Sequence, residues 1–243
     1  MVNKLSRSTD SNGRYSARSL NGTTIDLYPI SGVEFDYTVL GVKRPLQVTD
    51  SSTRSLTNAN LSPPGNFVAN TWYYIYAWWF PGNILIKPSL SFEISTSPPD
   101  SWKLYKTGDT SRKYLFAFRT DGMGNIIPFI RDGYTTRYLS GNRILTAASA
   151  AMDTVVDASA FIPPTSRLGL IRIFADNTAL AANTYVYLKP DPVTTVDGRL
   201  LGIPQNFYID DQIWVVSGTN QKYLYSTPVM ATKITLDVWG FIE

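Results

Sequence analysis

Residues 71–80 read TWYYIYAWWF and form the most unusual stretch of this 243-residue chain. In a β-strand, successive side chains point to opposite faces. One face of such a strand would carry Trp72, Tyr74, Tyr76, Trp78 and Phe80, and the other would carry Tyr73, Ile75, Ala77 and Trp79. An antiparallel strand with one face in water alternates polar with apolar residues, whereas this segment is apolar on both faces. It therefore predicts a strand that is covered on both sides.

Three interpretations are open for what covers these aromatic side chains. A central strand in the core of one chain comes first, a contact between subunits second, and a sugar-binding aromatic platform third. An aromatic side chain buries roughly 150–250 Å², so leaving one face in water would be costly. The residues assigned to the core or to a subunit interface are Trp72, Tyr74, Tyr76, Trp78 and Trp79.

Segments on the C-terminal side of this strand alternate with a period of two, which predicts further strands. Residues 90–95 (LSFEIS) should turn their apolar side chains toward a core and their polar side chains toward solvent. Residues 113–120 place Tyr114, Phe116 and Phe118 on one face. A loop at residues 121–125 (DGMGN) then predicts a hairpin.

The return strand of this hairpin is expected at residues 126–130, where Pro128 suggests an edge or a bulge. The Ala-rich residues 143–152 are interpreted as strand, residues 49–60 as a long surface loop, and Asp210-Asp211 as a turn. Additional strands are expected at residues 134–139, 154–157, 168–174, 184–188, 206–209, 213–216, 222–226 and 233–242.

Regular short strands separated by turns predict an all-β chain. The expected fold is two consecutive antiparallel β-sandwich modules, jelly-roll-like, preceded by an extended arm. Residues 1–20 form the arm, residues 21–142 the first domain and residues 143–243 the second, each domain of ordinary size for a sandwich.

The composition argues against most catalytic classes. The chain has no Cys and no His, which removes disulfides, Cys nucleophiles, His-based triads and the usual zinc ligands. Only three Glu occur, and no spacing singles out the facing pair of carboxylates that a glycosidase needs. We therefore expect no enzyme activity, no catalytic residue, no bound metal and no cofactor.

The positive charge of the chain is concentrated at its start. Lys4, Arg7, Arg14 and Arg18 precede a body, residues 19–243, with 18 basic and 18 acidic residues. A neutral body is a poor partner for nucleic acid, so the basic arm is interpreted either as an anchor on a larger particle or as a solvated tail. The longest apolar run, residues 73–80, is too short to span a membrane, and no secretory signal precedes it.

Several motifs resemble virion proteins of tailed bacteriophages, the group that includes capsid fibres, decoration proteins and tail fibres. They are TWYYIYAWW at residues 71–79, EISTSPPD at 93–100, KYLFAFRTDGMGNIIPF at 113–129, YTTRYL at 134–139, AFIPPTSRLGLIRI at 160–173 and ITLDVWGFIE at 234–243. Phe116 departs from that pattern, because a small Gly is common there. The resemblance covers most of residues 70–243.

The resemblance implies a structural or binding protein without catalytic residues. It implies β-sandwich modules that often form homotrimers. The expected location is the virion, after synthesis in the host cytoplasm, with the arm docking on capsid or tail proteins. A capsid decoration protein or short head fibre is the leading hypothesis, because no coiled coil or other shaft motif is present. The alternative is a tail-fibre or tail-tip module for host attachment, which recognises a glycan or protein receptor on the cell surface.

Overall fold

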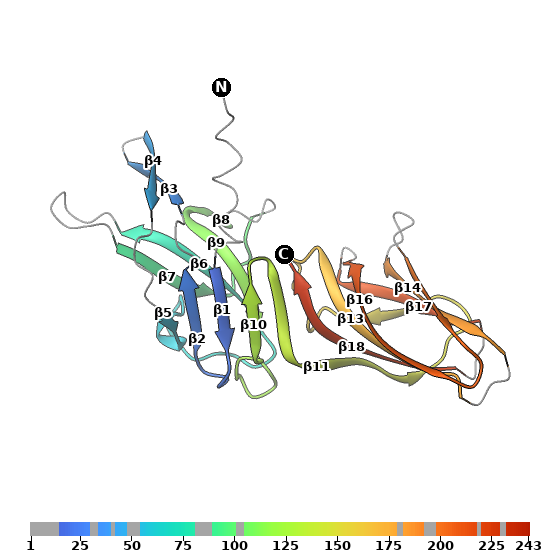
Figure 1. Cartoon of the computed structure of the whole chain (residues 1–243). Helices are drawn as coiled ribbons and strands as arrows, with labels where there is room; N and C mark the ends of the chain where they lie inside the picture. The colour runs from blue at the N-terminus through green and yellow to red at the C-terminus, as the bar shows by residue number, and fades with distance from the viewer. Residues whose placement is uncertain are drawn as a thin grey trace, which may run out of the picture. The chain divides into compact units, whose positions relative to one another are not determined.

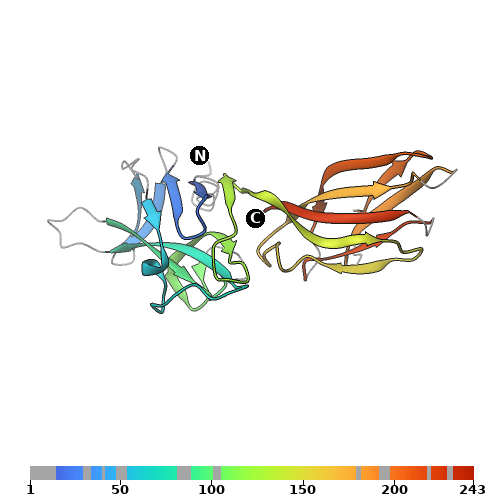
Figure 2. The ribbon, with the colours of Figure 1, turned by 90° about the horizontal axis from the view of Figure 1, so that it is seen from below.

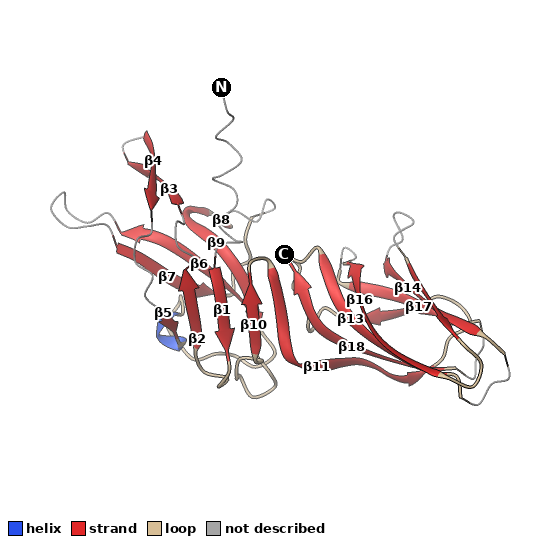
Figure 3. Cartoon of the chain, in the orientation of Figure 1, coloured by secondary structure: helices blue, strands red, loops and turns tan. Residues whose placement is uncertain are grey.

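The computed structural model describes residues 15–29, 34–39, 42–47, 54–80, 89–100, 105–178, 182–191, 198–217, 220–228 and 232–243 (Figure 1). Strands make up nearly all the regular structure of these ranges, and the helical element among them is the short 3₁₀ turn η3 (Asn58–Asn60) (Figure 3). The predicted all-β class is confirmed. The chain divides into two compact units, Met1–Tyr134 and Thr135–Glu243.

The first unit contains strands of two antiparallel sheets. Their strand orders are β10-β1-β2-β5 and β7-β6-β9-β8, and β3 pairs with β4 in a separate hairpin. The bounds are β1 (Tyr15–Ser19), β2 (Ile25–Pro29), β3 (Glu34–Val39), β4 (Val42–Gln47), β5 (Arg54–Leu56), β6 (Trp72–Phe80), β7 (Ser89–Ser95), β8 (Tyr105–Lys106), β9 (Asp109–Arg119) and β10 (Phe129–Asp132). The Phe116 ring meets the Phe129 ring edge-on with centroids 6.1 Å apart. This contact joins the two sheets across a common core.

The second unit has the topology of a jelly roll (Figure 2). Its bounds are β11 (Thr135–Ala148), β12 (Thr154–Asp157), β13 (Leu168–Asp176), β14 (Thr184–Asp191), β15 (Arg199–Ile203), β16 (Tyr208–Val216), β17 (Lys222–Ser226) and β18 (Lys233–Ile242). The strand orders are β16-β13-β18-β11 and β12-β17-β14-β15. Counted from β11 as first, these orders are 6-3-8-1 and 2-7-4-5, the two-sheet arrangement of a jelly roll. Buried side chains such as Ile173, Val186, Tyr223 and Leu236 fill its core.

The chain around the predicted hairpin differs from the expectation. Thr120 and Ile126 form an isolated antiparallel bridge, but Pro128 precedes β10, and β10 pairs with β1 in the other sheet. The segment therefore carries the chain from one sheet to the other. The hairpin is not continued because the backbone turns away after the Thr120–Ile126 bridge and joins β1 through β10.

This loop is held by a set of short hydrogen bonds. Thr120 Oγ1 donates to the Val68 carbonyl at 2.6 Å and accepts from the Thr71 N–H at 3.0 Å. Asp121 Oδ1 accepts the N–H groups of Met123 and Asn125 at 2.8 and 2.9 Å. The TDGMGN motif thus fixes residues 68–71, at the entrance of β6, to the end of β9.

Gly124 shows why this loop needs glycine. Its φ is +84°, and a Cβ there would lie 2.8 Å from the Phe67 carbonyl oxygen. Both the left-handed backbone and the close approach exclude a side chain.

A bulge in β9 changes the predicted faces of that strand. Ile75 pairs with Phe116, but the neighbouring Tyr76 pairs with Tyr114, so Leu115 is an extra residue. Tyr114 therefore clusters with Tyr74 and Tyr76, on the face opposite Phe116. The expectation that Tyr114 shares a face with Phe116 is wrong, because one bulged residue reverses the alternation.

Three further predicted segments differ in the structure. Part of the predicted loop at residues 49–60 forms β5 and η3, and residues 48–53 lie outside the described residues. Asp210-Asp211 lies inside the continuous strand β16, not in a turn. β11 runs through positions 142 and 143, where the domain boundary was expected, while the compact units divide at 134 and 135.

Candidate functional site

The aromatic strand β6 is buried on both faces within one chain. Tyr73, Ile75 and Ala77 on one face and Tyr74 and Tyr76 on the other are all less than 5% exposed. Trp72 and Trp78, at the two ends, are half-buried, and the side chain of Trp79 lies outside the described residues. The single chain therefore covers the middle of β6 without a partner copy.

Tyr76 anchors the second face of β6. Its hydroxyl donates to the Ser97 carbonyl at 2.7 Å, which ties the chain that follows β7 to the sheet. Burial raises the pKa of Tyr76 well above its ordinary value, and the neighbouring Tyr74, Glu93 and Asp100 raise it further. The hydroxyl therefore remains a neutral donor at physiological pH.

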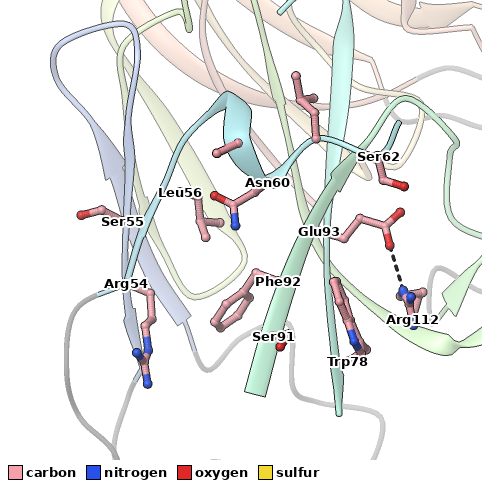
Figure 4. A pocket seen from close by; sticks show the side chains of 12 residues that line it. Arg54, Ser55, Leu56, Asn60, Ser62, Trp78, Ser91, Phe92, Glu93 and Arg112 are labelled. Atoms are coloured by element: carbon pink, nitrogen blue, oxygen red, sulfur yellow. Dashed lines mark hydrogen bonds and ion pairs between the residues drawn. The ribbon is translucent and has the colours of Figure 1, made fainter. Parts of the chain in front are cut away.

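A groove of about 810 Å³ lies in the first unit beside β7. It is lined by side chains from β5, η3, the following residues, and β6, β7 and β9 (Figure 4). The lining residues are Arg54, Ser55, Leu56, Ala59, Asn60, Leu61, Ser62, Trp78, Ser91, Phe92, Glu93 and Arg112. Its volume falls in the range of ordinary ligand sites.

One carboxylate organises the wall of this groove. Glu93, whose side chain is only 6% exposed, pairs with Lys106 Nζ at 2.5 Å and with Arg112 Nε at 2.8 Å. The Arg112 guanidinium lies 4.0 Å from the centroid of the Trp78 ring, a cation–π contact. Each Glu93 oxygen is held by a cation, so the cluster fixes the groove wall rather than leaving a free carboxylate.

The predicted solvent face of β7 is therefore covered. Glu93 and Ser95 are buried, because they lie on the same face as Tyr74 and Tyr76, which the chain after β7 covers. The sequence shows the alternation in LSFEIS but not that both faces of this sheet are covered.

Of the four basic residues of the predicted arm, the structure describes Arg18. Lys4, Arg7 and Arg14 lie outside the described residues. Arg18 lies in β1, where Ala17 and Ser19 are buried on either side of it. Its side chain is 3.7 Å from Asp26 and lies over the Tyr28 ring at 5.2 Å. Arg18 is thus a sheet residue, because strand pairing with β2 and β10 begins before residue 20.

The second unit carries a row of alternating charges across one sheet. Arg172 on β13 pairs with Asp210 on β16 at 2.5 Å and approaches Asp237 on β18 at 3.6 Å. Asp237 also pairs with Arg143 on β11. The four side chains therefore connect β16, β13, β18 and β11 on one face, and the side chain of Asp237 is only 5% exposed.

The sequence singled out Trp78 but not the polar residues that line the groove with it. Glu93, Arg112 and Asn60 come from three separate segments, and only the pairing of β6 with β7 and β9 brings the first two together. Glu93 was conspicuous as one of three Glu in the chain. No spacing rule connects it with Arg112.

A comparison of the chain with protein-family models and with curated protein sequences finds no significant match. In the described ranges, no cluster of three or more His, Cys, Asp or Glu side chains is placed to hold a metal ion. Among the same residues, no helix is long and apolar enough to cross a membrane.

Proposed function

We propose that this chain is a structural protein on the surface of a tailed-bacteriophage particle. Its most specific form is a capsid decoration protein or short head fibre that docks through its N-terminal arm and assembles as a homo-oligomer, with a homotrimer as the specific expectation. The observation that carries the proposal is the jelly-roll topology of the second unit. Jelly rolls recur in viral capsid domains and in lectins.

The motif resemblance supports the same proposal, and the structure gives it a physical meaning. The TDGMGN motif forms the hydrogen-bonded loop that joins the end of β9 to the entrance of β6. Residues 234–242 lie in β18, a central strand of the jelly roll. These two motifs thus lie in structural parts of the two units. Because fold alone does not define function, location on a particle must be measured.

A second candidate is a host-attachment module at the tail. The groove beside β7 favours it, because a partly exposed Trp78 stands there with Arg112, Asn60 and several Ser. Aromatic rings beside polar groups suit recognition of a receptor. This candidate shares the fold with the first and differs from it in place and partner.

Immunogold labelling of intact particles distinguishes the two candidates. Antibody raised against the purified chain is applied to the particles, and particles that lack the chain serve as the control. Label over the head supports the decoration or head-fibre proposal, and label at the tail supports host attachment. Particles without label above the control would refute both candidates.

A further inference from the structure

The groove contains an unpaired stretch of sheet edge. β7 is the first strand of the sheet β7-β6-β9-β8, so no other strand of the described residues pairs with its outer edge. The Ile94 carbonyl on this edge accepts the Ser62 N–H at 2.9 Å. Main-chain groups of a strand point alternately to the two sides. Phe92, two residues before Ile94, therefore also directs its N–H and C=O away from β6.

The chain begins to cover this edge and then leaves it. Leu61 forms a parallel bridge with Ile94, but the residues before Leu61 turn into η3. Thr57 and Asn60 close a capping box around that turn, which holds the backbone in the 3₁₀ conformation. Consequently, no residue of the described ranges forms a bridge with β7 at Phe92 on this side, and the groove opens at that place.

We propose that this groove captures an extended polypeptide segment of a partner protein, which adds a strand to the β7 edge at Phe92. Exposed edges are templates for strand addition, and main-chain hydrogen bonds supply affinity in such complexes. The bridge between Leu61 and Ile94 shows that the same edge already accepts an extended segment of this chain. The inference goes beyond the proposed function, since it concerns an interaction of the purified protein wherever the protein is located.

The groove walls specify the partner's side chains. Leu56 and Phe92 lie on one side of β7, and Trp78, Glu93 and Arg112 lie on the other (Figure 4). A captured strand would present alternate side chains to these two walls. The preferred segment therefore alternates aliphatic residues with polar ones.

Charge narrows the class of segment further. The lining carries Arg54, Arg112 and Glu93, and Glu93 is also held by Lys106. Asp109 also lies 3.9 Å from Arg112, so the three cations Arg54, Arg112 and Lys106 face two carboxylates and leave one net positive charge, which favours acidic residues at the polar positions of the segment.

The test uses the full-length protein labelled with ¹⁵N at phenylalanine. The probe is the acetylated and amidated heptapeptide TVDVDVT, which alternates aliphatic with acidic or hydroxyl residues. Hydrogen exchange of the Phe92 amide is followed with and without the peptide. In the free protein, this amide should exchange faster than the Phe116 amide in the central region of the sheet. At a free peptide concentration ten times the dissociation constant, exchange of the Phe92 amide should slow about tenfold.

Three controls separate strand addition from other binding. A peptide that is N-methylated at every residue cannot donate main-chain hydrogen bonds from either edge, and it should lose binding. A peptide with Lys in place of Asp should bind more weakly. Arg54→Gln should lower the affinity for the acidic peptide several-fold. Arg199→Gln, which changes an exposed arginine of the second unit, should leave that affinity unchanged.

Four results would overturn the proposal. They are a Phe92 amide already as protected as that of Phe116, no binding at about 5 mM peptide, binding that survives N-methylation, and equal binding of the Lys peptide. A fifth experiment addresses another ligand class with an acidic oligosaccharide as the probe. If the oligosaccharide binds the groove and the acidic peptide does not, the site is a saccharide site and strand addition is wrong.

Discussion

Gly240 occupies a position in β18 where no side chain fits. A Cβ there would lie 2.2 Å from the Thr136 carbonyl oxygen and 3.1 Å from the Arg137 Cα. Both atoms are backbone, so they cannot rotate away as a side chain could. We expect Gly240→Ala to lower the free energy of unfolding by about 1–3 kcal/mol, the usual cost of overpacking. Chemical denaturation of the purified variant measures this change.

Gly202 is the matched control for this prediction. It lies in β15 of the same unit, and a Cβ there meets no atom within 4 Å. Gly202→Ala should change the free energy of unfolding by less than about 0.5 kcal/mol. Equal effects of the two substitutions would show that close packing of β18 on β11 is not the cause.

A titratable pair on the surface of the second unit supplies a pH prediction. The hydrogen bond from Arg172 holds the pKa of Asp210 below its ordinary value. A carboxylate with a lowered folded pKa stabilises the protein above its unfolded pKa, about 3.9, and this contribution is lost as the pH falls through the folded pKa. Arg172→Gln should raise the pKa of Asp210 toward the ordinary value, as measured by ¹³C NMR of the carboxyl group.

Arg172→Gln should also lower the free energy of unfolding relative to the wild-type protein. The part of this difference that comes from Asp210 should disappear at acidic pH, where Asp210 is protonated in both proteins. Arg137→Gln, which removes an exposed arginine of β11 in the same unit, serves as the control. An Asp210 pKa that does not move in Arg172→Gln would exclude the ion pair as the cause.

At the scale of elements, the loop after β9 is the connection most sensitive to a small change. Thr120 is fully buried, and its hydroxyl both donates to Val68 and accepts from Thr71. Thr120→Val keeps the volume but leaves those two main-chain groups without this partner. The expected loss of unfolding free energy is about 1–3 kcal/mol, measured by thermal or chemical unfolding.

Met123, at the tip of the same loop, is 84% exposed. Met123→Ala is therefore the control and should be nearly neutral. If Thr120→Val were equally neutral, the loop would be fixed by Asp121 and the glycines rather than by the Thr120 hydroxyl.

The accuracy of the sequence-based interpretation also varied by element. β17 and β18 begin and end at the predicted residues, because buried side chains recur at every second position in β17 and from Ile234 to Val238 in β18. The side of Tyr114 was mispredicted because the bulge at Leu115 has no signature in KYLFAF. β1 and β5 were missed because they carry only two apolar residues and one, too few for a periodic pattern to stand out.

The groove was the least predictable feature. Its lining depends on which strands pair and on where η3 leaves the edge of β7. Those are long-range consequences of the fold, and the local sequence around Asn60 or Arg112 does not encode them. The aromatic strand, by contrast, was recognisable from composition alone, since apolar residues on both faces require two covering layers.

At the scale of the whole molecule, the strand β1 limits what the arm can be. Tyr15–Ser19 pairs with β2 and β10, so a deletion through residue 18 would damage the first unit. The appropriate truncation removes residues 1–14. We expect this protein to retain the unfolding transition of the full chain and to lose attachment to particles, because Lys4, Arg7 and Arg14 are removed.

Attachment is measured by co-sedimentation of the truncated protein with particles that lack the chain. The full-length protein is the positive control, and a version with Lys4, Arg7 and Arg14 changed to Gln separates charge from length. Undiminished co-sedimentation of the truncated protein would refute the anchoring role of the arm and leave the fold unaffected.

The sheet edges at β16 and β7 differ in the charges that oppose pairing with a neighbouring molecule. β16, the outermost strand of its sheet, carries the exposed Asp210, Asp211 and Gln212 in succession. Charges on an edge oppose pairing with a neighbouring molecule. Such protection preserves solubility where many copies are crowded, during overexpression or on a surface of repeated subunits. The part of β7 at Phe92 has no comparable run of carboxylates, so concentrated solutions of the protein should begin to aggregate there.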